Sequence, residues 1–458
     1  MIYDLKEQEV ENGHQQSEVN VIPGALTQIA EGKTKTIFEI DGHPSKVLIR
    51  SRDRITAHDG KRAHVVEGKA TIANVTTCKI FQYLQECGIR THFIKQQSAS
   101  EFVAERCAMI PIEWVIRRVS TGSFLKRNPH VNEGYSFAPP KVETFFKDDS
   151  LGDPEWTIDT LLESAMVVGG VRINRAHVQL MQRVSALVFE ILERAWARRD
   201  CTLVDMKLEF GINADGDIVL ADVIDSDSWR LWPSGDPRLA KDKQSYRDAS
   251  SVTATELKKL FDDYSWVVEQ LKTFRTSVDH GRCVILMGSA SDSKFAAAIR
   301  AGCAEFGIPT EIRVTSAHKS TEDTLQIVKQ YEADLHRSTV FVCVAGRSNG
   351  LGPVLAGNTV CPVINCPPIA ADSPLAVNDI WSSLRMPSGI GCTTILGAEN
   401  AAFAVAATLA LVDDTIWSRL RVKQFLNVVS IKESDAKLMA EQRQKHDHDQ
   451  QNMANGIQ

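Results

Sequence analysis

The spacing of apolar segments changes near residue 270, and this change constrains the fold more than any other feature of the chain. Beyond it, apolar and β-branched runs of strand length alternate with segments of helix length. The expected elements are a strand at 283–287, a helix from Ser293, a strand at 311–315, a helix from Thr321, a strand at 339–345, and strands near Pro362 and Thr393. Because helices separate strands that are apolar throughout, the pattern predicts an α/β three-layer domain built on a parallel sheet.

The first half of the chain has a different pattern. Between about residues 25 and 270, short strands and hairpins come first, at 36–40, 46–50 and 114–119. A long amphipathic helix follows, with apolar residues at spacings of three and four. These residues are Val178, Met181, Val184, Leu187, Val188, Ile191, Leu192 and Ala195. This half therefore predicts an α+β domain.

A chain of 458 residues is long enough for two to four domains. We expect two folded domains joined by a polar linker, with polar, mobile segments at both ends. The expected parts are an N-terminal extension (1–24), a first domain (25–270), a linker (271–281), a second domain (282–430) and a C-terminal tail (431–458).

Composition argues against a nucleic-acid-binding, membrane-spanning or secreted protein. The 52 Lys and Arg against 58 Asp and Glu leave a net charge of -6, which gives no general attraction to nucleic acid or anionic membrane. The longest apolar run, 401–412, is Ala-rich and shorter than the about 18 residues of a membrane-spanning helix, so we expect a buried helix. Ten Cys without a Cys-x-x-Cys pair, and no secretory signal, predict reduced thiols in a cytosolic protein.

The segment 202–225 carries the strongest chemical signal of the first half. Apolar residues alternate there with three charged ones, so one face of the expected strand is charged. If Asp215 and Gly216 form a two-residue hairpin turn, Glu209 lies directly opposite Asp222. Opposed carboxylates repel unless a cation lies between them, which predicts Mg²⁺ bridging this pair to nucleotide phosphates. The alternative is a solvated edge hairpin whose acidic pair discourages aggregation.

Three basic clusters offer sites for an anionic ligand. Lys33 and Lys35 share one face of an expected strand, Arg117 and Ser123 belong to a segment rich in Arg, Ser and Gly, and Arg230 follows a second Ser. Arg beside hydroxyls and a Gly turn is typical of sites for sugar phosphates or carboxylates. Each cluster taken alone is equally consistent with ordinary solvated basic residues.

Five motifs in these segments resemble, in order, those of the phosphoribosylaminoimidazole-succinocarboxamide (SAICAR) synthetase family. They are EGKTK, PIEWVIRRVSTGSFLKRNP, LVDMKLEFG, DVIDSDSWRLW and KDKQSYRD, spread over about residues 25–270. The resemblance implies a two-lobed ATP-binding fold. There, ATP and Mg²⁺ would activate the carboxylate of carboxyaminoimidazole ribotide (CAIR), and the amine of L-aspartate would then form an amide.

The resemblance also implies roles for individual residues. Lys33 and Lys35 would contact ATP phosphates, Glu209 and Asp222 would hold Mg²⁺, and Lys207 would act on the reacting groups. The ribotide phosphate would be held by Arg117, Ser123 and Arg230. Asp59 would contact the aspartate or the nucleotide, although its neighbour His58 stands where many relatives have Gly.

Polar clusters in the second half each follow an expected strand. They are GSASD at 288–292, SAHK at 316–319 and AGRSNG at 345–350. The carboxyl ends of parallel strands meet at one edge of the sheet, where open sheets bind ligands. The first cluster suits a phosphate at a helix start but also ordinary helix capping. His318 suits acid-base catalysis, with a structural histidine as the alternative.

Together with CPP and WSSLRMPSGIGCTT, these clusters resemble the CO₂-using, animal class of aminoimidazole ribotide (AIR) carboxylase over about residues 282–425. The resemblance implies a flavodoxin/Rossmann-like fold in which AIR attacks CO₂ without ATP or biotin, while His318 moves the proton. It implies that Ser289, Ser291, Asp292 and Ser316 bind the ribotide. Lys319, Arg347 and Ser348 would polarise CO₂ or hold the new carboxylate. The segment 371–378 departs from the relatives and points to an altered loop.

The two resemblances together are those of the bifunctional animal enzymes of purine synthesis that convert AIR to CAIR and CAIR to SAICAR. They imply small-molecule partners only (AIR, CAIR, CO₂ and L-aspartate), with no nucleic acid and no membrane, and a cytosolic homo-octamer built through the carboxylase domain. One alternative is a monofunctional SAICAR synthetase with a C-terminal oligomerisation scaffold. The other is a nucleotide-binding regulatory protein without a reaction.

Overall fold

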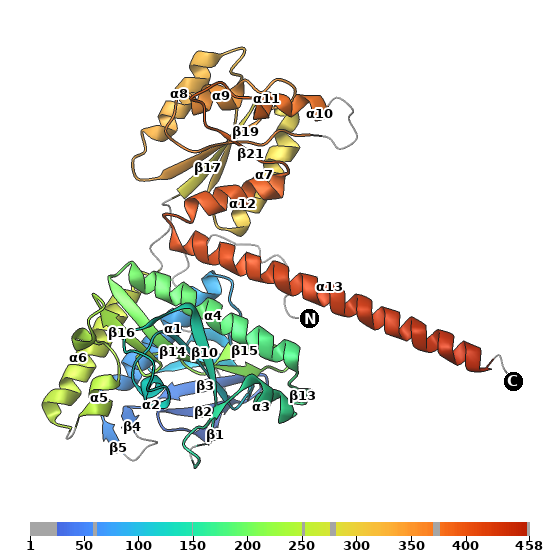
Figure 1. Cartoon of the computed structure of the whole chain (residues 1–458). Coiled ribbons are helices and arrows are strands. Elements are labelled where there is room, and N and C mark those ends of the chain that lie inside the picture. The colour runs from blue at the N-terminus through green and yellow to red at the C-terminus, as the bar shows by residue number, and fades with distance from the viewer. Residues whose placement is uncertain are drawn as a thin grey trace. The chain divides into compact units, whose positions relative to one another are not determined.

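The computed structural model describes residues 25–57, 62–148, 150–249, 252–274, 281–369 and 376–455. The chain divides into two compact units, residues 1–276 and 277–458, which Figure 1 colours from blue to yellow-green and from yellow to red. The expected N-terminal extension at 1–24 lies outside the described residues. Within the described ranges, no helix combines the length and apolar character that crossing a membrane requires.

The first unit contains an antiparallel sheet of five strands. In spatial order these are β1 (Leu26–Glu31), β2 (Lys35–Ile40), β3 (Lys46–Ser51), β7 (Glu101–Glu105) and β6 (Phe93–Gln96). Helix α1 (Lys69–Glu86) packs against this sheet, and α6 (Ala254–Leu271) packs against α1. The predicted strands at 36–40 and 46–50 are confirmed, and they pair with each other.

A second antiparallel sheet of seven strands forms the other lobe of this unit. Its strands are β11 (Glu155–Trp156), β10 (Ser136–Phe146), β9 (Ile112–Val119), β14 (Cys201–Ile212), β15 (Ile218–Ala221), β16 (Trp229–Pro233) and β8 (Ala108–Met109). The long strand β14 pairs with β9, β15, β16 and β8, so it is the centre of the lobe.

Helix α4 (Arg175–Ala197) covers β14 and β9. Every residue of the apolar stripe predicted for 178–195 is buried in it, because that stripe faces the sheet. The α+β prediction for this half is therefore confirmed. The unit is completed by β4 (Arg54–Ala57), β5 (Arg62–Val65), α2 (Ser123–Arg127), α3 (Ile158–Glu163), β12 (Val167–Val168), β13 (Val171–Arg172), the 3₁₀ helix η1 (Pro237–Leu239) and α5 (Gln244–Asp248).

The second unit is the predicted α/β domain with a parallel sheet of five strands. Their spatial order is β18 (Thr310–Val314), β17 (Gly281–Met287), β19 (Ser338–Val344), β20 (Val363–Asn365) and β21 (Thr393–Thr394). The second strand in sequence lies outside the first, which is the flavodoxin-like order of doubly wound sheets. The shorter helices are η2 (Ala290–Asp292), α7 (Ser293–Glu305), α8 (Thr321–Glu332), α9 (Leu351–Ala356), α10 (Ala376–Asp379) and α11 (Trp381–Leu384).

Alternate residues of the central strands pack into opposite layers. Cys283 and Ile285 of β17 belong to a core shared with α7 and α12 (Ala398–Leu409). Val284 and Leu286 belong to a core shared with α8 and α9. Both faces of the sheet are therefore covered, which explains why its strands are apolar throughout.

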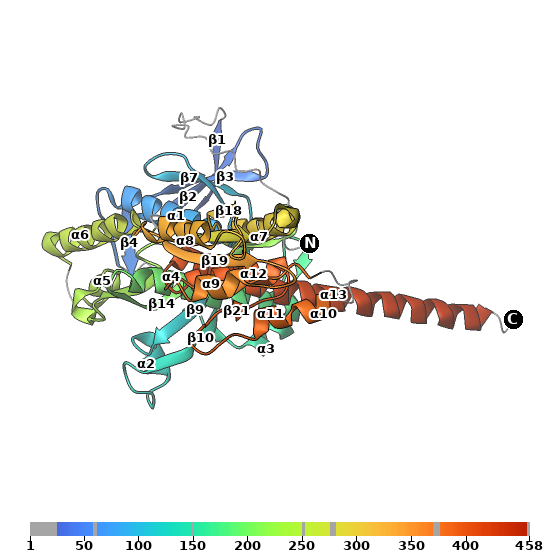
Figure 2. The same ribbon diagram turned by 90° about the horizontal axis from the view of Figure 1, so that it is seen from above.

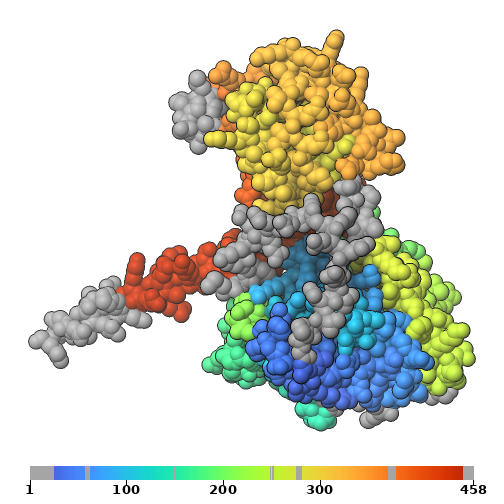
Figure 3. Space-filling model, turned by 180° about the vertical axis from the view of Figure 1, so that it is seen from behind, coloured from blue at the N-terminus to red at the C-terminus, as the bar shows by residue number. Residues whose placement is uncertain are grey.

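The C-terminal part of the chain is helical. The Ala-rich run predicted to be a buried helix forms α12, and Ala401, Ala402 and Val405 are fully buried in it. Helix α13 (Asp414–Asn455) then continues through the segment expected to be a polar tail (Figures 1 and 2). Its residues from 431 to 446 are all exposed, and in Figure 3 this stretch projects as a single column of atoms.

Candidate functional site

A cavity of about 1020 Å³ lies in the first unit. Its lining includes residues from the turn before β2, from β9 and α2, from β14 and from the segment after β15. The candidate residues that line it are Lys33, Lys35, Arg117, Ser123, Lys207, Asp222 and Arg230. Segments separated by nearly two hundred residues thus line one cavity.

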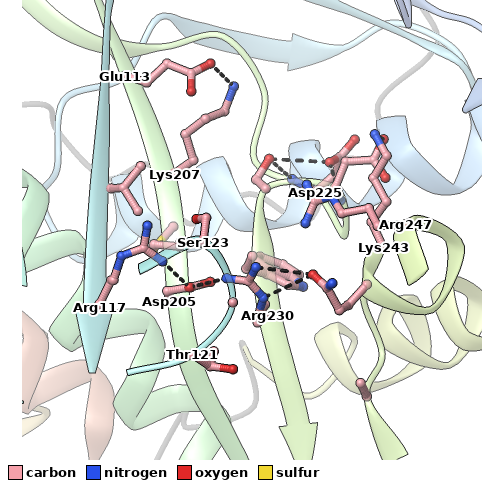
Figure 4. Close-up of a pocket in the computed structure, with 18 of the residues that line it drawn as sticks. Glu113, Arg117, Thr121, Ser123, Asp205, Lys207, Asp225, Arg230, Lys243 and Arg247 are labelled. Carbon is pink, nitrogen blue, oxygen red and sulfur yellow. Dashed lines mark hydrogen bonds and ion pairs between the residues drawn. The ribbon is translucent and has the colours of Figure 1, made fainter. Parts of the chain in front are cut away.

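Three neighbouring strands place a row of charges across the floor of this cavity. Asp205 of β14 lies directly opposite Arg117 of β9 and also opposite Arg230 of β16. Its Oδ2 accepts from Nη1 of Arg117 at 2.7 Å and from Nη1 of Arg230 at 2.5 Å (Figure 4). Gln244 accepts two further hydrogen bonds from Arg230. Both guanidinium groups are therefore held in fixed planes beside the cavity.

Lys207 stands between two carboxylates on the same side of the sheet. Its Nζ lies 2.8 Å from Oε1 of Glu113 and 2.9 Å from Oε1 of Glu209. Burial by itself would lower the pKa of Lys207, but the two carboxylates raise it above its ordinary value. Lys207 is consequently held as a cation between the two carboxylates.

The register predicted for the hairpin after β14 is wrong by one residue. Glu209 pairs with Ala221 and not with Asp222. The side chain of Asn213 accepts backbone hydrogen bonds from Asp215 and Asp217, which widens the turn beyond the two residues that were assumed. Asp222 lies just past the end of β15 with a φ of 63°, which turns it away from the ladder.

Despite this shift, both carboxylates interact electrostatically with Lys35. Asp222 forms an ion pair with Lys35. Burial lowers the pKa of Lys35 to about 8, and the largest opposing influence is the charge of Glu209. Burial would raise the pKa of Glu209, but Lys207, Lys147 and Lys35 together lower it to about 2. The side chain of Lys147 donates to Glu209 at 2.6 Å.

The donor set suits Mg²⁺ only in combination with a ligand. Among the described residues, no cluster of three or more His, Cys, Asp or Glu side chains is arranged to hold a metal. Mg²⁺ is commonly bound by one or two carboxylates together with substrate phosphates. Glu209 and Asp222 fit that arrangement, because the charge of Glu209 acts on Lys35 and Asp222 forms an ion pair with it.

Sequence reasoning missed several charged residues of this cavity. Glu113, Asp225, Asp227 and Lys243 line it. Burial would raise the pKa of Asp227, but the ammonium groups of Lys69 and Lys243 and the hydroxyl of Tyr264 lower it below its ordinary value. Glu113 was detectable, because it shares the inward face of β9 with Arg117 at a spacing of four. The pairing of Lys69 with Asp227, at 3.1 Å, is long-range and leaves no local pattern.

In the second unit, the three polar clusters meet at one edge of the sheet, as predicted. Met287 is level with Val314 on one side and with Val344 on the other, so the segments that follow these strands start side by side. Ser289 caps η2 and accepts the backbone N–H of Ser291 at 3.3 Å. The capping interpretation of this cluster is thus confirmed. It leaves a ligand role open, because both side chains are exposed.

His318 lies against the loop that follows β19. A Cβ added to Gly350 would be 2.4 Å from Nε2 of His318, so glycine is needed for this close approach. Within the same loop Arg347 has a φ of 54° and, like Ser348, Lys319 and His318, is exposed. The remaining candidates, Asp292 and Ser316, belong to the two segments that begin at this edge.

Asn349 holds this loop to α11. Its backbone N–H donates to Oγ of Ser382, and its side-chain amide donates to Oγ of Ser383, both at 3.0 Å. Ser382 also donates to the backbone carbonyl of Arg347 at 2.9 Å. Asp59 and residues 371–375 of the departing segment lie outside the described residues.

These sites define a class of protein. The first unit carries a cationic cavity with a lysine–carboxylate cluster, and the second carries Ser, His and Arg at the ligand-binding edge of a parallel sheet. Both arrangements are typical of enzymes that act on small phosphorylated or carboxylated substrates.

Comparison with known proteins identifies the family. The SAICAR synthetase family model matches residues 28–262, and the AIR carboxylase family model matches residues 282–427. A bifunctional phosphoribosylaminoimidazole carboxylase/phosphoribosylaminoimidazole succinocarboxamide synthetase of Drosophila melanogaster is 52% identical over 90% of this chain and 95% of its own length. The Homo sapiens protein of the same name is 50% identical over 90% of this chain and 96% of its own length.

The chain therefore belongs to this bifunctional family, and it is an enzyme with a SAICAR synthetase domain followed by an AIR carboxylase domain. A phosphoribosylaminoimidazole-succinocarboxamide synthase of Chloroflexus aggregans matches 53% of the chain and 94% of its own length at 43% identity. The monofunctional alternative is not favoured, because the bifunctional relatives match both halves.

Proposed function

We propose that the second unit carboxylates AIR with CO₂ to CAIR, and that the first unit then joins CAIR to L-aspartate at the expense of ATP, giving SAICAR, ADP and phosphate. The observation that carries this proposal is the convergence of Lys35, Arg117, Lys207 and Arg230 on one cavity from four separate segments. Such a cavity suits two anionic substrates at once.

In the synthetase site, Arg117 and Arg230, which we call the arginine row, bind the ribotide phosphate, with Ser123 as a hydroxyl donor. Lys33 and Lys35, which also line the cavity, contact the ATP phosphates. Asp59 contacts the aspartate or the nucleotide. Glu209 and Asp222 hold Mg²⁺, which, when bound, offsets the negative charge of the nucleotide phosphates.

The chemistry requires an activated carboxylate, since a carboxylate is a poor electrophile. An oxygen of the CAIR carboxylate attacks the γ-phosphorus of ATP, the bond to ADP breaks, and an acyl phosphate forms. The amine of aspartate then forms the C–N bond, phosphate leaves with the bonding electrons, and the amine loses a proton. Lys207 is catalytic as a fixed cation that stabilises the developing negative charge.

In the carboxylase site, the imidazole carbon of AIR forms a C–C bond to CO₂ and gives up its proton to His318. Ser289, Ser291, Asp292 and Ser316 hold the ribotide. Lys319, Arg347 and Ser348 polarise CO₂ and hold the new carboxylate. No step uses ATP or biotin. The close contact between Gly350 and His318 supports this proposal, because it joins the second and third clusters.

We further infer that the enzyme is cytosolic, that it binds neither nucleic acid nor membrane, and that it assembles through its carboxylase domain as a homo-octamer. The basis is the family resemblance and the net charge of -6. Sedimentation of the purified chain measures the assembly state.

The experiment that tests the function is a two-stage assay on the purified chain. AIR and bicarbonate are supplied first, and aspartate with Mg-ATP is added later, while CAIR, SAICAR and ADP are measured separately. We expect CAIR in the first stage and SAICAR with equimolar ADP in the second. If SAICAR formed only from added CAIR, the second unit would be a scaffold and the role of His318 would be wrong.

A further inference from the structure

A buried carboxylate behind the arginine row has no role in the proposed chemistry. Glu143 is on β10, and only 2% of its side chain is exposed. Its Oε2 accepts from Nε of Arg117 at 2.5 Å, and its Oε1 accepts from Nη2 of Arg127 at 2.8 Å. Arg127 lies at the end of α2, which follows the glycine turn at Gly122.

The position of Glu143 follows from the strand register. Arg117 pairs with Lys141 across the β9–β10 ladder, so Glu143 is the diagonal neighbour on the same face. Asp205 approaches Arg117 from the opposite strand. The two carboxylates thus use the Nε and one Nη of a single planar guanidinium, which fixes both its position and its plane.

The resulting network alternates in charge from β10 to β16. Glu143, Arg117, Asp205 and Arg230 follow one another, and Arg127 branches from Glu143. Each of the three guanidinium groups has a carboxylate partner, and Arg127 donates in addition to the more exposed Glu155. The arginines and Asp205 line the cavity, whereas Glu143 lies behind them.

A buried ionic network of this kind is poor evidence for stability, because desolvation of its charges offsets their attraction. Its position beside a cavity therefore indicates a functional cause. From this geometry we infer that Glu143 is a positioning residue of the SAICAR synthetase site, which orients Arg117 and Arg127 toward an anionic phosphomonoester. The inference rests on the proposed function and adds Arg127 to the groups that bind the ribotide.

The test compares two glutamates that contact the same arginine. Glu155 accepts from Nε of Arg127 at 2.9 Å, but 44% of its side chain is exposed. In the full-length protein, Glu143→Gln keeps the shape and one acceptor oxygen but removes the charge, and Glu155→Gln makes the same change at the solvated partner. We expect Glu143→Gln to raise KM for CAIR about tenfold with less than a twofold change in KM for ATP. Glu155→Gln should leave both constants within about twofold.

Direct binding separates this inference from the proposed function. Calorimetry of CAIR with each variant, without ATP and in a His318→Asn background that blocks decarboxylation at the second unit, requires no turnover. Binding of CAIR at the second unit is then common to all the proteins compared. Weaker CAIR binding by Glu143→Gln alone supports the positioning role even if the wild-type chain formed no SAICAR, which would overturn only the proposed function. Equal CAIR affinity in the wild type, Glu143→Gln and Glu155→Gln would overturn the positioning role.

A second variant covers the case in which Glu143→Gln does not fold. Glu143→Asp keeps the charge but shortens the side chain by one methylene, so it cannot span both arginines. Carboxylation by the second unit serves as the measure of active enzyme in each preparation. We expect Glu143→Asp to raise KM for CAIR while the kcat of amide formation changes less. A wild-type KM in that variant would refute the positioning role.

Discussion

At the scale of single residues, this enzyme positions its cations with buried carboxylates. Asp205, only 5% exposed, holds two arginines, and Glu209, only 3% exposed, holds Lys207 and Lys147. A buried carboxylate that loses its partners is costly, so these contacts resist rearrangement. The site can therefore stabilise the charge of the substrate without rearranging its own side chains. This preorganisation is the main source of electrostatic catalysis.

Replacing Glu209 tests whether the lysines that it holds, Lys207 and Lys147, are needed for amide formation. Glu209→Gln removes the charge that holds Lys207 and Lys147 and that supports the proposed Mg²⁺ site. We expect ATP-dependent amide formation to fall by about 10²-fold or more, with carboxylation unchanged. The measurement is the two-stage assay, in which each activity is followed in the same tube. Equal loss of both activities would mean that the substitution disturbs the whole chain.

Close packing at Gly122 gives a second test. Gly122 has a φ of 60°, and a Cβ there would lie 2.5 Å from Nη2 of Arg230. We expect Gly122→Ala to displace that guanidinium and to raise KM for CAIR by about tenfold, with less effect on KM for ATP.

Gly134 is the matched control for this substitution. Its φ is 79°, but nothing lies within 4 Å of an added Cβ. Gly134→Ala also places a side chain at a positive φ and should leave KM for CAIR unchanged. If both variants raised it equally, backbone strain and not the contact with Arg230 would be the cause.

At the scale of elements, the candidate catalytic and binding residues of the second unit lie where its strands end. The loops after β17, β18 and β19 carry the carboxylase candidates, since parallel strands in register end at one edge. Helix α13, in contrast, carries none of the candidate residues in its exposed part. Its exposed part is rich in Ala, Lys, Glu, Gln and Arg, which favour helix without a core to bury.

The strand-end position of His318 leads to a prediction for carboxylation. His318→Asn removes the proton acceptor while keeping a polar side chain beside Gly350. We expect conversion of AIR to CAIR to fall by about 10²-fold or more, with consumption of supplied CAIR unchanged. The measurement is the rate of CAIR formation at saturating bicarbonate. Full retention of that activity would show that His318 has a structural role only.

Helix α1 gives a prediction for alkaline stability. Cys78 is fully buried, and burial raises the pKa of its thiol from 9.0 to about 12. A raised folded-state pKa stabilises the fold below pH 9, and this contribution is lost as the pH rises, because the unfolded chain ionises first. Between pH 8 and 10 the free energy of unfolding falls by roughly 1 kcal/mol from this cause.

Denaturant unfolding of Cys78→Ala measures this contribution. The variant should be less stable than the wild type at pH 7, because it leaves a cavity. Its free energy of unfolding should, however, decline by roughly 1 kcal/mol less between pH 8 and 10. Parallel declines in the two proteins would show that this thiol does not cause the alkaline loss.

At the scale of the whole molecule, each site is built from residues of its own unit. The synthetase cavity is lined by residues between Lys33 and Lys259, and the carboxylase candidates all follow strands of the second unit. The two activities should therefore be separable. We expect CAIR made at one site to reach the other through solution.

Mixing two defective variants tests this separation. Glu209→Gln and His318→Asn should each block the conversion of AIR to SAICAR when used alone. A mixture of the two purified proteins should restore it, because each variant supplies the missing step. Time courses of CAIR and SAICAR provide the measurement. Failure of the mixture, with each remaining single activity intact, would show that CAIR does not pass through solution.

The sequence by itself determined the elements and the regions of the two sites. Apolar periodicity is local, so it predicted the stripe of α4, the strands of the parallel sheet and the edge where their polar loops meet. Motifs of adjacent residues likewise indicated the arginines and lysines of the cavity. The tertiary structure alone decided which charges meet. The turn at Asn213 moved Glu209 opposite Ala221, and Glu143 joined Arg117 through the register of β9 with β10. Such pairs depend on packing between distant segments, and a carboxylate becomes a partner only where the fold buries it beside a cation.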